Sequence, residues 1–182
     1  AESIFFILEG AMKLLFLCLF CFRLFAAEEI RVMGVGYCTV DLLVQVEDSF
    51  VEEHIGSKKG ECQREEAFEP IDFVLTKLRK EPKTAPGGSA ANTMRALAQL
   101  GQPCAFWGHV GEDSWGESFA GDLLKHRIDP RLKKAPFTSR VLCLISPDGQ
   151  RTFLSCDPEV EEMPVPSDFQ GIQWMHFEAR QL

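Results

Sequence analysis

Strand-like and helix-like segments alternate along this chain, and the alternation restricts the folds open to it. Residues 30–46 are rich in β-branched side chains and are punctuated by two glycines, which predicts a strand that runs into a second strand. Residues 70–78 and 89–100 have the apolar spacing of helices, and a buried strand is expected over residues 105–110. Strands that alternate with helices predict a parallel sheet covered by those helices.

The segments between these elements have patterns of their own. Residues 47–67 are polar and charged, which predicts an excursion over the surface. Ser114 and Glu117 have the spacing of a capping box, so a helix is expected to begin there. Residues 147–150 combine Pro, Asp and Gly, which favours a tight turn with one positive φ in a β-hairpin, and residues 172–177 resemble a last strand. The side chains that the helix after Ser114 is expected to bury are Trp115, Phe119, Leu123 and Leu124.

Residues 1–28 differ from the rest and are expected to form an apolar leader. From Met12 the sequence has a lysine, an apolar run over residues 14–22 and a pair of alanines at 26–27, which is typical of a secretory signal peptide. The apolar run is too short to span a bilayer. Export through this segment and an apolar leader on a cytoplasmic protein are both open, with residues 29–182 as the folded part.

Charge and cysteine content argue against several classes of protein. The 182 residues carry a formal net charge of -8 with a sequence pI of about 5.1, which disfavours a nucleic-acid surface. The seven cysteines are scattered rather than spaced as a disulfide or zinc framework, so they are expected to be reduced. The sequence has no P-loop, no complete dinucleotide fingerprint, no zinc-protease motif and no serine-hydrolase elbow. The sequence therefore disfavours a P-loop protein, a Rossmann dehydrogenase and a hydrolase.

The most informative stretch is a pair of glycines, Gly87 and Gly88, directly before the helix expected over residues 89–100. Paired glycines let a ligand approach the backbone at a helix N-terminus, where free N–H groups favour oxygen-rich groups. Asn92 lies in the first turn, and its side chain leans toward the glycines because helical side chains point to the N-terminus. A glycine-rich turn with an asparagine near the cap has the same pattern, so both interpretations stay open.

Two acidic residues are further candidates. Asp41 closes the first β-segment, where ligands of α/β sheets usually bind, and a carboxylate there can accept two vicinal hydroxyl protons. A turn aspartate is the alternative. His176 and Glu178 alternate onto one face of the last strand, but no third metal ligand accompanies them. A packed histidine is therefore favoured over a metal site.

The stretches at residues 87–101 and 108–116 resemble the N-terminal signature of the PfkB family of kinases. The insertion before the double glycine most resembles the adenosine-kinase-like branch, which also contains sugar kinases. The resemblance implies a ribokinase-like α/β fold, in which an open, mostly parallel sheet is flanked by helices and a small β lid closes over the sugar. This chain would cover the N-terminal part of that fold. Shorter agreements occur at residues 36–41, 46–50, 59–60, 148–152 and 174–178.

The resemblance also implies roles for individual residues. Asp41, the two glycines and Asn92 would bind hydroxyls of a ribose or hexose, and Glu178 stands where some members contact the sugar. Arg151 follows the lid turn, where a matching arginine in adenosine-kinase-like members lies near the transferred phosphate. A solvated hairpin residue is the alternative for Arg151. The implied substrate-binding residues are Asp41, Gly87, Gly88, Asn92, Arg151 and Glu178.

The activity that the resemblance implies is transfer of the γ-phosphate of ATP, with Mg²⁺, to a hydroxyl of an adenosine-like nucleoside or a sugar. In the family, the last Asp of a C-terminal D-T-x-G-A-G-D segment takes the hydroxyl proton, and residues 1–182 contain no such segment. Residues 120–122 imitate its end but fall inside a predicted helix. We therefore expect the catalytic base and the ATP site to lie C-terminal to residue 182, and this chain to be inactive alone.

Two other hypotheses stay open at this point, a non-catalytic sugar- or nucleoside-binding module and a decayed kinase gene. The need for ATP favours the cytoplasm over export. The expected partner is a small sugar or nucleoside, with no nucleic acid and no stable membrane span. The lid of such a fold also offers strands through which two copies could form a homodimer.

Overall fold

The computed structural model of the chain describes residues 29–56, 58–159 and 170–178, and the expected leader lies outside these residues. Its helices are α2 (Asp48–His54), α3 (Glu69–Lys77), α4 (Ser89–Gln99) and α5 (Ser114–Lys125). Its strands are β1 (Val32–Val35), β2 (Thr39–Gln45), β3 (Cys62–Glu65), β4 (Lys83–Pro86), β5 (Cys104–Gly111), β6 (Asp129–Ala135), β7 (Ser139–Ile145), β8 (Arg151–Cys156) and β9 (Trp174–Phe177). Among the described helices, none is long and apolar enough to cross a membrane.

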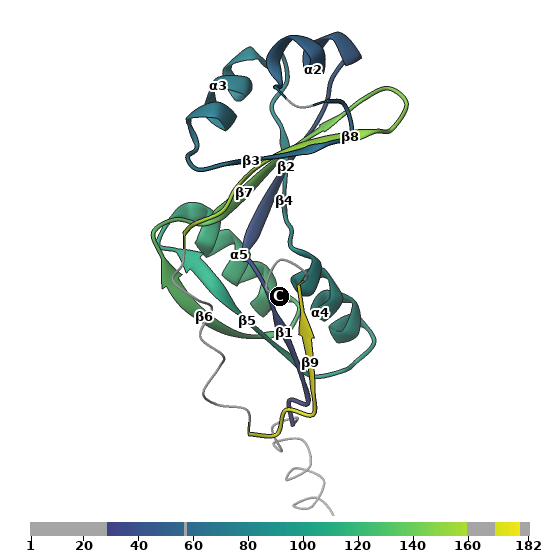
Figure 1. The fold of residues 1–182 in the computed structure, drawn as a ribbon. Coiled ribbons are helices and arrows are strands. Elements are labelled where there is room, and N and C mark those ends of the chain that lie inside the picture. The colour runs from purple at the N-terminus through teal and green to yellow at the C-terminus, as the bar shows by residue number, and fades with distance from the viewer. Residues whose placement is uncertain (1–28, 57, 160–169, 179–182) are drawn as a thin grey trace, which may run out of the picture.

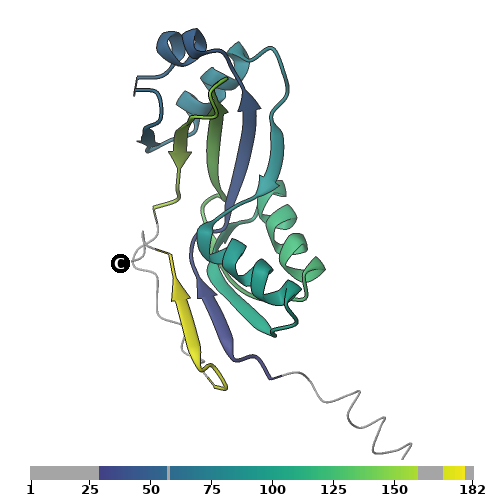
Figure 2. The same ribbon diagram turned by 90° about the vertical axis from the view of Figure 1, so that its right-hand side faces the viewer.

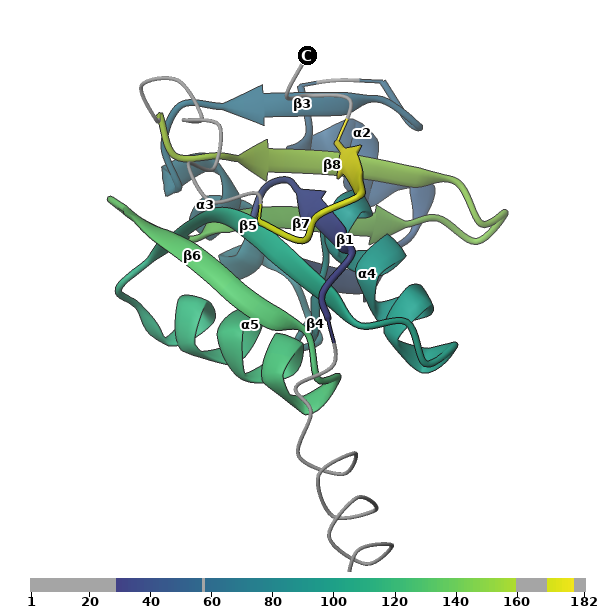
Figure 3. The same ribbon diagram turned by 90° about the horizontal axis from the view of Figure 1, so that it is seen from below.

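The predicted parallel sheet is confirmed as one of two sheets. Its strand order is β6-β5-β1-β9, and all three pairings are parallel. Helices α4 and α5 pack on one face, where Met94, Phe106 and Phe119 are fully buried in one apolar cluster. Figure 3, a view from below, shows both helices on the same side of β1 and β5. Met33 and Trp107 belong to a separate cluster on the opposite face of the sheet.

The second sheet forms the predicted lid. Its strand order is β3-β8-β7-β2-β4, with antiparallel pairing between β7 and β8 and between β2 and β4. One face packs against α2 and α3 through buried side chains such as Leu42, Leu144 and Ile71. Figure 1 shows this sheet with its two helices at one end of the molecule and α4 and α5 at the other. The chain first passes from one sheet to the other over the three residues 36–38, between β1 and β2. Figure 2 shows the two groups of strands one above the other.

The predicted hairpin between β7 and β8 is confirmed. Gly149 has a φ of +84°, and the Ser146 N–H donates to the carbonyl of Gln150 at 2.9 Å. Lys59 ties this turn to the rest of the lid, because its Nζ lies 2.7 Å from an Asp48 oxygen and 2.9 Å from an Asp148 oxygen. Gly149 therefore supplies the positive φ expected for this turn. Lys59 holds the turn against α2 through its two ion pairs.

The prediction that residues 47–67 only cross the surface is wrong. They contain α2 and β3, and Val51 and Ile55 are buried in the lid core. β3 is short and polar, and it pairs with β8, which lies about ninety residues later in the chain. A strand whose partner is so distant and whose side chains are mostly exposed has no local apolar pattern to reveal it.

The start of α5 also differs from the prediction. The N-cap is Asp113 rather than Ser114, and its Oδ1 accepts a hydrogen bond from the Gly116 N–H at 2.8 Å. Asp113 also accepts bonds from the N–H and the hydroxyl of Thr138, at 2.9 and 2.7 Å. Phe119 and Leu123 are buried and Trp115 partly so, as expected, but Leu124 is 61% exposed because α5 contacts the sheet along one face only.

Asp113→Ala is expected to lower the free energy of unfolding by about 2 kcal/mol, because it removes a helix cap and leaves the Thr138 donors unpaired. Burial acts to raise the pKa of Asp113, but hydrogen bonds from Thr138 and Gly116 lower it below its ordinary value of 3.8. The stabilisation is therefore present above that value and is lost as the pH falls through the lowered pKa. Urea unfolding at pH 7 and at pH 3 measures both effects. An equal loss at the two pH values would contradict this account.

Candidate functional site

Asp41 and Gly87 pack against each other at the junction of the two sheets. Asp41 is the third residue of β2 and pairs in register with Ala85 of β4 and Val141 of β7. A Cβ added to Gly87 would lie 2.5 Å from the carboxyl carbon and from both carboxyl oxygens of Asp41. The prediction that Asp41 closes the first β-segment is wrong, because that strand ends at Val35 and Asp41 lies inside the next one. Its carboxylate keeps this place only while residue 87 has no side chain.

The chain turns from β4 into α4 at Gly88. Its φ of +84° is a left-handed conformation that favours glycine, and a Cβ there would lie 2.8 Å from the carbonyl oxygen of Tyr37. The Gly87 N–H donates to the Thr39 carbonyl at 2.7 Å, which fixes the loop to the start of β2. No side chain caps α4, so the N–H groups of its first turn can serve an oxygen-rich ligand. The predicted glycine loop and helix start are confirmed in structure.

Asn92 lies in the first turns of α4 with its side chain exposed, and its Oδ1 accepts a hydrogen bond from Arg95 Nη1 at 2.6 Å. Arg95 also donates through Nε to Asp122 Oδ2 at 2.5 Å. Asp122 lies inside α5, as expected, and is paired with this guanidinium. Sequence reasoning did not single out Arg95. Its position three residues after Asn92 on one helix was the available signal, because such side chains are neighbours.

Glu178 follows β9 and lies beside the segment that joins β1 to β2. Its Oε2 accepts a hydrogen bond from the Tyr37 N–H at 3.3 Å, and a Cβ on Gly36 would lie 2.7 Å from the same oxygen. The prediction of a packed histidine is wrong, because His176 is exposed on the short strand β9, where its Nε2 lies 3.3 Å from the hydroxyl of Thr93. Within the described part of the chain, no three His, Cys, Asp or Glu side chains are grouped as metal ligands.

Burial sets the protonation of two groups at the junction. It raises the pKa of the Asp41 carboxyl above its ordinary value of 3.8, and the positive charge of Arg95 opposes the rise. It also raises the pKa of the Cys38 thiol, and the negative charge of Glu178 adds to that rise. Cys38 is therefore a neutral packed thiol at pH 7, whereas the Asp41 carboxyl titrates at a pKa above its ordinary value.

Arg151 lies apart from these residues. It is the exposed first residue of β8, and its guanidinium carbon is 6.0 Å from the ring centroid of Phe153. β7 pairs Val141 with both Asp41 and Ser155, so Arg151 lies four residues farther along the lid, about 13 Å at the usual rise per residue. Side-chain alternation places it on the same face of the lid as Asp41. Its role in contacting phosphate stays a prediction.

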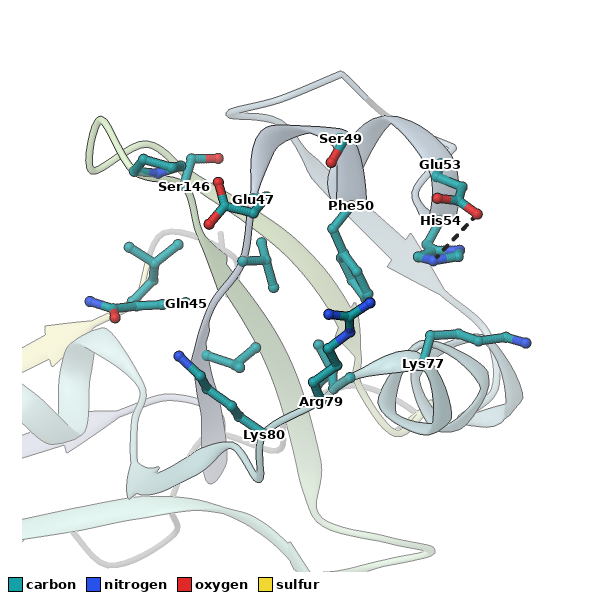
Figure 4. Close-up of a pocket in the computed structure, with 15 residues that line it drawn as sticks. Gln45, Glu47, Ser49, Phe50, Glu53, His54, Lys77, Arg79, Lys80 and Ser146 are labelled. Carbon is teal, nitrogen blue, oxygen red and sulfur yellow. Dashed lines mark ion pairs between the residues drawn. The ribbon is translucent and has the colours of Figure 1, made fainter.

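A cavity of about 790 Å³ lies at the outer end of the lid, and Figure 4 shows the side chains that line it. It lies between α2, the C-terminal end of α3 and the end of β2, and none of the six predicted substrate-binding residues lines it. Lys77, Arg79 and Lys80 line it together with Glu47 and Glu53, so both signs of charge are present. The substrate site predicted from the sequence is thus distinct from this cavity.

Comparison with protein families and curated proteins finds carbohydrate kinases. The family model described as pfkB family carbohydrate kinase matches residues 54–182. A fructokinase of Klebsiella pneumoniae is 34% identical over 98 residues, which are 50% of this chain and 32% of that protein. A probable fructokinase-3 of Arabidopsis thaliana is 34% identical over 93 residues, which are 46% of this chain and 27% of that protein. This chain therefore spans about a third or less of the length of these relatives.

Solved structures share the fold. The adenosine kinase from Sinorhizobium meliloti has a TM-score of 0.71 and 27% identity, over 82% of this chain and 47% of that chain. A probable sugar kinase protein from Rhizobium etli CFN 42 has a TM-score of 0.74 at 24% identity, over 84% of this chain and 48% of that chain, and this likeness bears on the fold alone. Both confirm the predicted α/β architecture, and this chain spans about half of each.

Proposed function

This chain belongs to the pfkB family of carbohydrate kinases, and we propose that the protein transfers the γ-phosphate of ATP to a hydroxyl of a sugar or an adenosine-like nucleoside. The observation that carries the proposal is the Asp41 carboxylate held against Gly87, beside the uncapped start of α4. A carboxylate accepts hydroxyl protons, while backbone N–H groups and the Asn92 amide donate to hydroxyl oxygens. Together they complement a polyhydroxylated substrate.

The lid sheet would cover the bound substrate with its open face. Strand register places Leu43, Cys143 and Phe153 on the same face as Asp41, opposite the face that packs on α2 and α3. Phosphoryl transfer depends mainly on positioning the acceptor hydroxyl and on excluding water, rather than on covalent chemistry by the protein. We assign positioning to Asp41 and Asn92, and exclusion of water to the lid.

Other parts of the proposal concern groups outside the described residues. ATP and Mg²⁺ are expected from the family, but the described residues offer no clustered ligand set for a metal ion. We place the catalytic base outside them as well, because Asp122 is paired with Arg95. The need for ATP favours the cytoplasm. A homodimer would form through β3 or β4, the outer strands of the lid sheet.

Calorimetric titration of the purified chain with adenosine, ribose and fructose, without ATP, tests the proposal. We expect saturable binding of at least one of them and a loss of about tenfold or more for the matched 2-deoxy compound, because one hydroxyl hydrogen bond to a charged group is removed. Radiolabelled ATP added to the same mixtures should give no sugar phosphate. Transfer by this chain alone would contradict our placement of the base, and absence of all binding would contradict the substrate class.

A further inference from the structure

Arg95 is a mostly buried cation that contacts several parts of the candidate site. Its side chain is 11% exposed, and its Nε lies 2.5 Å from Asp122 Oδ2 of α5. Its Nη1 donates to Asn92 Oδ1 at 2.6 Å and to the Gly87 carbonyl at 3.4 Å. The guanidinium carbon lies 5.7 Å from the ring centroid of Phe119, which belongs to the core between α4 and α5. One side chain therefore joins the glycine loop, the Asn92 amide and the neighbouring helix.

These contacts decide which end of the Asn92 amide faces a ligand. A guanidinium has only donors, so the amide must turn its oxygen toward Arg95. The amide nitrogen, with two N–H donors, then remains for a ligand. Arg95 cannot turn away at low cost, because that would leave Asp122, whose side chain is 18% exposed, without its cation. Contacts within the protein therefore fix the orientation of the Asn92 amide before any ligand binds.

We propose that Arg95 is a positioning residue, which locks the Asn92 amide so that its Nδ2 donates to a substrate hydroxyl oxygen while Asp41 accepts a hydroxyl proton. This division of roles favours a vicinal diol. An ether oxygen satisfies Asn92 but gives Asp41 no proton, and an ammonium satisfies Asp41 but gives Asn92 no acceptor. The ligand class rests on the proposed function, whereas the locked amide is a property of the protein without ligand.

The locked amide can be observed directly, because Asn92 is the one asparagine in the 182-residue sequence. Selective ¹⁵N-asparagine labelling of the full chain gives a single side-chain amide, whose ¹⁵N–¹H nuclear Overhauser effect reports its motion. We expect a value close to that of the helix backbone in the unaltered chain and in Leu123→Val, a control that loosens the same core. Arg95→Met should lower it markedly. An unchanged value in Arg95→Met overturns the proposal, whether or not the chain binds any sugar.

Affinity provides the second readout, with adenosine and ribose as the probes. Arg95→Met and Asn92→Ala should each weaken binding about tenfold, and most of the loss caused by Arg95→Met should disappear once Asn92 is already Ala, since Arg95 acts mainly through Asn92. The remainder reflects the charge of Arg95 on Asp41. Leu123→Val should bind within about twofold of the unaltered chain. Losses that multiply in the double variant would show that Arg95 acts by general destabilisation, and would overturn the proposal. If the unaltered chain binds neither probe, the substrate class fails while the amide measurement still decides the role of Arg95.

Discussion

Asp41→Asn is expected to weaken binding of sugars and nucleosides by about 100-fold at pH 7, because the amide keeps one neutral acceptor oxygen where the carboxylate has two charged ones. Its melting temperature should be equal to or higher than that of the unaltered chain. Burial raises the pKa of Asp41 in the folded state, and the charge of Arg95 only partly offsets this rise. Ionising this carboxyl therefore costs stability in the folded protein, and an asparagine of the same shape avoids that cost.

The sign of the pH dependence follows from the same shift. A carboxyl whose folded pKa lies above its ordinary value of 3.8 holds its proton more tightly when folded, so stability falls as the pH rises through that window. Ligand affinity changes in the opposite sense, because a carboxylate accepts two hydroxyl protons more strongly than a neutral carboxyl accepts one. Calorimetric titrations and thermal unfolding between pH 4 and pH 8 measure both. In Asp41→Asn, neither the stability nor the ligand affinity should show the pH dependence that the Asp41 carboxyl causes.

A matched control separates the effect of the site from a general effect of charge. Asp129 lies on β6, where it pairs with Arg131 at 2.9 Å, away from the junction. Asp129→Asn should leave affinity unchanged, because surface ion pairs contribute little. A stable Asp41→Asn variant that binds as tightly as the unaltered chain would remove Asp41 from the site. A less stable variant would contradict the argument from burial.

Those parts of the site that depend on local chemistry could be predicted from the sequence. The glycine loop at residues 87–88, the helix that follows it and the hairpin with a positive φ at Gly149 each follow from a few adjacent residues. The parallel sheet follows from alternation along the chain. The prediction for Asp41 is wrong because no local pattern shows that the second strand of residues 30–46 belongs to another sheet, with Asp41 in its interior.

The features that were missed depend on distant partners. β3 exists because β8 offers it an edge, and its own side chains are too polar to predict a strand. Asp113 caps α5 in place of Ser114 because Thr138 adds two further hydrogen bonds to the same carboxylate. Arg95 becomes part of the site because α5 brings Asp122 to it. In each case a tertiary contact decides between local alternatives of similar propensity.

Gly87→Ala is expected to reduce affinity for sugars and nucleosides by about 100-fold, as much as the loss of Asp41 itself. A Cβ at this position would lie 2.5 Å from three carboxyl atoms of Asp41, which is closer than such atoms approach, so the carboxylate must turn away or the loop must move. The strain should also lower the free energy of unfolding by about 1–3 kcal/mol. Urea unfolding and calorimetric titration of the same samples measure the two effects.

Gly121→Ala is the matched control for Gly87→Ala, because it adds the same methyl group where nothing lies within 4 Å. It replaces an exposed glycine inside α5, so it should raise the free energy of unfolding by about 1 kcal/mol and leave affinity unchanged. A double variant with both substitutions should regain stability but not binding. If restored stability also restored binding, the loss in Gly87→Ala would come from the fold, and the contact between Gly87 and Asp41 would not define the site.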